Sequence, residues 1–174
     1  MTESRRAAGE WTLWVVAISS ALHAWEEYAT GWQAWAVDSL GLAMPTGRFA
    51  LMNVVLVAAG LAFAAVGWRR TAAALVIPAA TLVNALFLHL LPTVLEGRIV
   101  PGFWTALLLY LPFSTWAFVA AWRDGVPRRN LAFAFLGGSA MMTTVILVSR
   151  ALGPVARSAA LGALLLFPVY SAFQ

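Results

Sequence analysis

Long runs of apolar residues, separated by short polar connectors, constrain this 174-residue chain more than any other feature. Hydrophobic residues make up 62% of the chain and charged residues only 10%, and the mean hydropathy is +0.83. Several runs approach the roughly 20 residues that a helix needs to cross about 30 Å of hydrocarbon. The sequence therefore predicts an all-α fold, a polytopic bundle of transmembrane helices, and excludes an ordinary soluble domain.

We expect a single integral membrane domain over residues 1–174 with five to six spanning helices. The spans are expected at about residues 11–29, 49–67, 71–92, 102–122, 130–149 and 156–173. The first span could continue to residue 35, and a loop is expected over 36–47. Pro112 predicts a kink in the fourth span, and Gly137-Gly138 predicts a close approach of the fifth span to a neighbour. Pro168 interrupts the last apolar segment, so a count of five spans stays open.

All eleven basic residues are arginines, and they lie at the ends of the apolar runs. If the spans alternate in direction, seven arginines fall on the side of the N-terminus and four on the other. Because basic residues concentrate in cytoplasmic loops, this asymmetry predicts a multi-pass protein of the cytoplasmic membrane with a cytoplasmic N-terminus. No basic face remains for DNA or RNA, which excludes a nucleic-acid partner despite the net charge of +4. The absence of cysteine excludes disulfides and thiolate metal sites.

Three ionisable residues, His23, Glu26 and Glu27, lie inside the first apolar run. Glu26 lies three and Glu27 four positions after His23, so all three share one face of a helix. A charge near the bilayer centre costs roughly 2.5–3.5 kcal/mol, and such groups usually turn into a bundle, pair with one another or line a functional cavity. We therefore expect this cluster to be the functional site, in the outer half of the membrane.

The third expected span carries His89 near its outer end and Asn84 about one and a half turns deeper. His23 and His89, the two histidines of the chain, are thus expected at the same depth. This coincidence predicts that His89 meets the histidine and the two glutamates of the first span. Asn84 and His89 lie about 140° apart on an ideal helix, so both can face one site only if that helix is distorted, which nearby prolines permit.

Three short signatures add a resemblance to this pattern. They are His23-Ala24-Trp25-Glu26-Glu27, Asn84-Ala85-Leu86-Phe87-Leu88-His89 and Pro101-Gly102-Phe103-Trp104-Thr105. In this order they resemble the HXXEE, NXXXXH and PGXXT motifs of the HXXEE-domain family of bacterial integral membrane proteins. The resemblance covers about residues 11–105. It implies a protein of the bacterial inner membrane and marks positions, but it names no reaction.

One interpretation of the cluster is a metal site. His23, Glu26, Glu27 and His89 could supply two imidazoles and a carboxylate to one divalent ion, Zn or Fe, with a position left for water or substrate. One glutamate would bind the ion, and the other would act as a base or orient a ligand. The protein would then be a membrane-embedded, metal-assisted enzyme acting on an apolar small molecule, a lipid or an isoprenoid. The HExxH signature typical of zinc sites is absent.

The alternative enzyme is a metal-free isoprenoid cyclase or isomerase that uses the same residues as acid and base. Two neighbouring carboxyl groups in a dry pocket resist simultaneous ionisation, so the glutamates could donate and accept a proton with the histidine as relay. Aromatic faces could stabilise a cationic intermediate, and the candidates are Trp25, Tyr110 and Trp116.

Further polar residues are expected to support the site or to pack. Asn84 would hold a carboxylate or the substrate, and Thr105 would contact the backbone or the site. Asn53 is expected to make one interhelical hydrogen bond, with substrate contact as the alternative. A purely structural cluster and an ion or proton carrier also stay open, although the polar residues below His23 form only a thin path toward the cytoplasm. The sequence does not indicate an oligomeric state.

Overall fold

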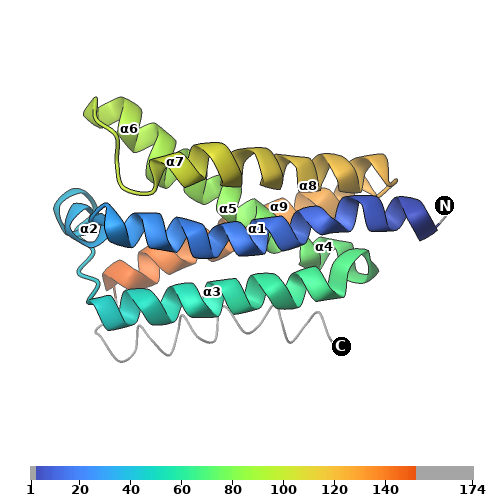
Figure 1. Ribbon diagram of the computed structural model, residues 1–174, viewed down its shortest axis with the longest axis horizontal. Helices are drawn as coiled ribbons and strands as arrows, with labels where there is room; N and C mark the ends of the chain where they lie inside the picture. The colour runs from blue at the N-terminus through green and yellow to red at the C-terminus, as the bar shows by residue number, and fades with distance from the viewer. Residues whose placement is uncertain (1–2, 152–174) are drawn as a thin grey trace.

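The computed structural model describes residues 3–151, which form a bundle of helices joined by short turns (Figure 1). The long members of the bundle are α1 (Glu3–Ala29), α3 (Thr46–Val66), α5 (Val76–Asn84), α8 (Leu111–Arg123) and α9 (Arg128–Ala151). Helix α3 packs on α1, α9 packs on α5, and α8 contacts both α1 and α5. The predicted all-α bundle is therefore confirmed for the described residues.

Among residues 3–151, four helices are long and apolar enough to cross a membrane, which supports a multi-pass membrane protein. They are Thr46–Ala74, Val76–Glu96, Phe103–Arg123 and Arg128–Leu147. They correspond to the second to fifth expected spans, and their outer faces carry exposed apolar side chains such as Val54 and Leu108, as contact with lipid requires. Helix α1 is also long but less apolar, because it carries charged residues near its start as well as His23, Glu26 and Glu27. The sixth expected span, 156–173, lies outside the described residues.

A short helix, α2 (Trp32–Leu40), occupies residues that we expected to extend the first span or to begin a loop. Gly31 separates it from α1 with a φ of 83°, a left-handed conformation that favours glycine. The loop predicted over 36–47 is therefore wrong for its first five residues. Trp32 and Trp35 of α2 are buried in a cluster that covers one end of the bundle (Figure 1).

Two of the spans contain a π-helical turn, which is wider than an α-helical turn. These turns are η2 (Ala85–Leu90) and η3 (Ala106–Tyr110). Each is followed by a proline at the second position of the next helix, Pro92 in α6 (Leu91–Glu96) and Pro112 in α8. Proline lacks an N–H group and its ring clashes with the carbonyl four residues earlier, which lies inside the π turn in both cases. The kink predicted at Pro112 takes this form.

The opposite end of the bundle is closed by a tight turn between α3 and α5. It consists of a 3-10 turn, η1 (Gly67–Arg70), and α4 (Thr71–Ala74). The backbone N–H of Trp68 donates to Glu10 Oε1 at 2.9 Å, and its indole N–H donates to Asp124 Oδ2 at 3.1 Å. This one tryptophan therefore ties the turn to α1 and to the end of α8.

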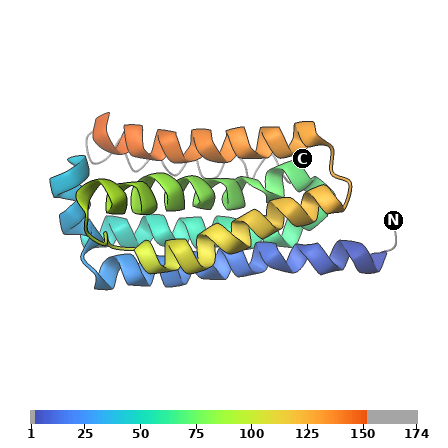
Figure 2. The same ribbon diagram turned by 90° about the horizontal axis from the view of Figure 1, so that it is seen from above.

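Helix α9 lies along the bundle against α5 (Figure 2), and Gly138 sets their separation. A Cβ atom at Gly138 would lie 2.5 Å from Ala79 Cβ and 2.5 Å from the Val76 carbonyl oxygen. At Gly137 the nearest atom, a Val76 methyl group, would be 3.6 Å away. The close approach predicted for Gly137-Gly138 is thus confirmed, and the second glycine makes it possible.

Candidate metal centre

A polar cluster is buried where α1, η2 and the start of α7 (Phe103–Thr105) meet. His23, Glu27 and His89 are 2%, 6% and 0% exposed. Both His23 Nε2 and His89 Nε2 approach Glu27 Oε1, at 3.4 Å and 3.5 Å. The two imidazole rings meet edge to face, with their centroids 4.7 Å apart. The structure thus brings histidines from two different helices to one carboxylate.

The other ring nitrogen of each histidine has a partner that determines where the proton lies. His89 Nδ1 lies 2.7 Å from the Pro101 carbonyl oxygen, and because a carbonyl only accepts, Nδ1–H is the donor. His23 Nδ1 lies 2.7 Å from Thr105 Oγ1, whose own hydroxyl donates to Glu26 Oε2 at 2.5 Å. Thr105 therefore offers a lone pair to His23 Nδ1–H. With both protons on Nδ1, both Nε2 atoms carry lone pairs.

These two Nε2 lone pairs are buried and have no hydrogen-bond partner among the described residues. Together with Glu27 Oε1 they form a group of three acceptor atoms, all within 4.8 Å of one another. Buried acceptor atoms that face one another without a donor are energetically unfavourable. A cation bound between them would satisfy their lone pairs. In a tetrahedral zinc site with bonds of about 2.0–2.2 Å, ligand atoms lie roughly 3.3–3.6 Å apart. The two Nε2–Oε1 distances of 3.4 and 3.5 Å fit this range, so these residues could hold a metal ion.

Glu26 does not join this group, although it neighbours Glu27 in the sequence. Its carboxylate accepts the backbone N–H groups of Trp104 at 3.0 Å and Thr105 at 2.7 Å, as well as the Thr105 hydroxyl. The first N–H groups of a helix have no partner inside that helix, and a carboxylate there satisfies them. Glu26 therefore caps α7 and lies outside the group of three acceptor atoms.

The loop before α7 crosses directly over the three candidate ligands. Gly102 has a φ of 82°, and a Cβ atom there would lie 2.6 Å from His89 Cε1 and 2.9 Å from both Glu27 Cγ and His23 Cε1. Only glycine fits so close to the cluster. With the Pro101 carbonyl on His89 and the Thr105 hydroxyl on His23, this segment of the chain encloses the site on one side.

The two π turns orient site residues that lie five positions apart. Hydrogen bonds in a π helix join residues i and i+5, so side chains at this spacing lie about one turn apart. Asn84 precedes η2 and His89 lies inside it, and this wider turn is a distortion of the kind expected for the third span. Thr105 and Tyr110 flank η3, and the Tyr110 ring lies 4.4 Å from that of His23 between centroids. Tyr110 thus packs against a histidine of the first helix, and Asn84 lines the pocket beside Glu27.

An apolar pocket extends from Glu27 between α3 and α9. With its open mouth it holds about 880 Å³ of space free of protein atoms. Its polar lining includes Glu27, Asn84 and Tyr110, and Asn84 Oδ1 is buried without a hydrogen-bond partner among the described residues. Apolar side chains line most of the remainder, among them four methionines, Met44, Met52, Met141 and Met142. The pocket connects a candidate metal ligand to a space suited to hydrocarbon.

Other expected site residues lie elsewhere. Asn53 lines the pocket, but its Nδ2 group donates to the Phe49 carbonyl within α3, at 3.0 Å, rather than to another helix. Trp25 is 71% exposed, because it lies about 200° around α1 from His23. Trp116 is half exposed as well. Neither tryptophan lines the pocket.

Some site features have no clear signal in the sequence. In the sequence Met141 and Met142 are expected only to pack, and no spacing relates them to the methionines near α3. Four of the five methionines of the chain nevertheless line this one pocket. The Pro101 carbonyl is a backbone group, which no side-chain pattern reveals.

Comparisons with known proteins agree with the three motifs. A family model described as a protein of unknown function with an HXXEE motif matches residues 14–117. This range contains both histidines, the two glutamates and the α7 segment that encloses them. No curated protein and no solved structure matches the chain.

Proposed function

Because the chain belongs to the HXXEE family, a family of unknown function, we propose a function from its site alone: a membrane-embedded, metal-assisted enzyme acting on an apolar lipid-like or isoprenoid substrate. One observation carries the proposal, the convergence of three acceptor atoms on His23, Glu27 and His89 with no donor between them. Two imidazoles and one carboxylate are a recurrent ligand set for Zn and Fe, and they leave a position open for water or substrate.

The residues around the ligands support this role. Thr105 and Glu26 form a chain of hydrogen bonds to His23 Nδ1, and the Pro101 carbonyl accepts from His89 Nδ1. Such partners hold an imidazole in the ligating tautomer and increase the basicity of the nitrogen that faces the ion. A bound divalent ion would supply Lewis acidity and a more acidic water molecule. Glu27, which faces both the cluster and the pocket, would bring the substrate and the ion together.

The pocket supports an apolar substrate that arrives from the bilayer. It lies between α3 and α9, and both helices belong to candidate membrane spans. Its lining is mostly aliphatic and aromatic, with a few polar groups, as in many sites for small apolar ligands. A soluble, polar substrate would gain little from such walls.

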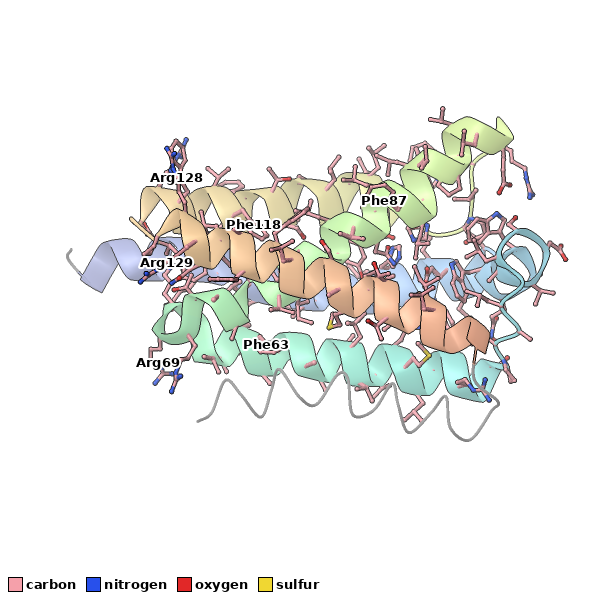
Figure 3. All side chains as sticks on the ribbon, turned by 180° about the vertical axis from the view of Figure 1, so that it is seen from behind. Phe63, Arg69, Phe87, Phe118, Arg128 and Arg129 are labelled. Atoms are coloured by element: carbon pink, nitrogen blue, oxygen red, sulfur yellow. The ribbon has the colours of Figure 1, made fainter. Side chains whose placement is uncertain are left out.

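We further propose that α1 is a fifth span and that the N-terminus lies in the cytoplasm. Helix α1 runs beside α3 along the bundle (Figure 1), so α1 would lie at the same depth in the membrane as the candidate span that contains α3. Arg69, Arg128 and Arg129 gather at the end of the bundle where α1 begins (Figure 3), as the positive-inside rule expects for a cytoplasmic face.

Metal analysis of the purified protein tests the proposal. We expect about one Zn or Fe ion per chain in the wild type, and none after His23→Ala, His89→Ala or Glu27→Gln. Asp38→Asn, which removes a carboxylate from the exposed part of α2, is the matched control and should keep the ion. Wild-type protein that stays folded but cannot be loaded with either metal would refute the metal centre. Conversion of an isoprenoid by that metal-free protein would instead favour acid–base chemistry.

A further inference from the structure

The pocket beside Glu27 has a few polar side chains, Asn84 among them, and otherwise apolar walls, which restricts what can occupy it. We propose that it binds an uncharged long-chain alcohol, with the hydroxyl at Asn84 and the chain between α3 and α9. This inference deepens the proposed function by naming its substrate class, and it rests on that function only in treating the Glu27 end as the reacting end.

The need for a hydrogen-bond donor follows from Asn84. Asn84 lines the pocket, and its Oδ1 atom is buried and has no partner among the described residues. Trp32 Nε1, which also lines the pocket without a partner among the described residues, is a donor and not an acceptor. Thr81 already bonds Ser114 at 2.7 Å, and Asn53 bonds the Phe49 carbonyl. A buried acceptor left unsatisfied is unfavourable, so a ligand that donates to Asn84 is bound more tightly than one that cannot.

The absence of charge follows from the composition of the walls. No lysine or arginine is among the described residues that line the pocket, and its lining includes the carboxylate of Glu27. A phosphate or carboxylate head group is normally held by arginine, lysine or several N–H donors. The pocket offers the carboxamide of Asn84, the phenol of Tyr110 and the carboxylate of Glu27, which suit a hydroxyl group better than an anion.

The long chain follows from the remaining walls. Met52 and Leu56 come from α3, and Met141, Met142 and Val145 come from α9. Unbranched methionine side chains adapt to the shape of a flexible ligand. Since both helices belong to candidate spans, the occupant is a molecule that already dissolves in the bilayer. A hydrocarbon chain attached to a hydroxyl group meets each of these conditions.

Binding of tritiated farnesol to the protein in nanodiscs tests this inference. Unlabelled farnesol, farnesyl methyl ether and farnesyl phosphate serve as competitors that differ only in the head group. We expect farnesol to compete roughly 5- to 100-fold better than the ether, which cannot donate, and better than the phosphate. Specific binding that farnesol does not displace, or equal competition by the ether or the phosphate, would overturn the inference.

Variants assign the preference to one side chain. Asn84→Leu should remove the preference for the alcohol over the ether, whereas Asn84→Asp, which keeps an acceptor, should retain it. Asn130→Leu, the same change in α9 outside the pocket lining, is the matched control. Metal content measured on the same samples separates the two proposals. A protein without metal that still prefers the alcohol refutes the metal centre alone, and a metal-loaded protein without the preference refutes the alcohol site alone.

Discussion

Replacement of Gly102 by alanine should weaken metal binding and stability together, because this glycine lies against all three candidate ligands. Two terms contribute. A residue with a side chain at a φ of 82° costs roughly 1–2 kcal/mol, and overpacking of a tight site costs roughly another 1–3 kcal/mol. The new Cβ atom would lie 2.6 Å from His89 Cε1, a contact that the chain can relieve only by moving a ligand or the loop.

Gly97 offers a matched control in the same loop region. Its φ is 66°, but a Cβ atom there meets no atom within 4 Å. The free-energy cost of Gly97→Ala is therefore only that of the left-handed backbone conformation. The difference between the two variants, about 1–3 kcal/mol, is therefore the contact with the cluster. If the ligands move to relieve it, metal affinity in Gly102→Ala should fall roughly 5- to 150-fold below that in Gly97→Ala.

The assay is a competition titration against a chelator of known affinity, with thermal unfolding measured on the same preparations. We expect Gly97→Ala to bind metal like the wild type and to unfold at a slightly lower temperature. Gly102→Ala should lose both affinity and stability. Equal metal affinity in the two alanine variants would show that the loop does not enclose the ion, and the ligand assignment would then be wrong.

Three further outcomes are expected. Thr105→Val should reduce metal affinity roughly 10- to 100-fold by removing the partner of one imidazole, whereas Thr105→Ser should restore it, and the same chelator titration would reveal a purely steric role if serine failed. Gly138→Ala should lower the thermal stability far more than Gly137→Ala, because only the former places a methyl group 2.5 Å from Ala79 Cβ; equal melting temperatures would contradict the α5–α9 packing. Trp25→Ala should leave metal content and farnesol binding unchanged, since this side chain is 71% exposed, and a loss of either would reopen an aromatic role.

The location of the cluster could be predicted because hydropathy determines helix boundaries and boundaries determine depth. Counting from the expected ends of two spans placed His23 and His89 at one level, and the structure brings their rings together. The same argument could not choose between Glu26 and Glu27, since both lie on the face of His23. That choice depends on where α7 begins, because its free N–H groups bind Glu26 and leave Glu27 to the histidines.

Other features depend on tertiary context in a similar way. Prolines predict distortion, but a proline alone does not distinguish a kink from the π turn that contains His89. Helix α2 was not expected because Gly31, which ends α1, lies in a segment without a strong polar interruption. The pocket was not expected because its walls come from distant helices, and apolar residues that line a cavity look the same in a sequence as those that pack.

The hydrogen bonds between Glu26 and α7 also bear on how the chain enters the membrane. Glu26 and Thr105 are 79 positions apart, so α1 leaves the ribosome long before the N–H groups that satisfy its carboxylate exist. Until then the Glu26 carboxylate lacks the N–H groups that satisfy it, and insertion of this helix alone is unfavourable. We therefore expect α1 to be held by the translocon or at the lipid surface until the hairpin of η2 and η3 has been made. The site would then assemble in the same step that seats the first helix in the bilayer.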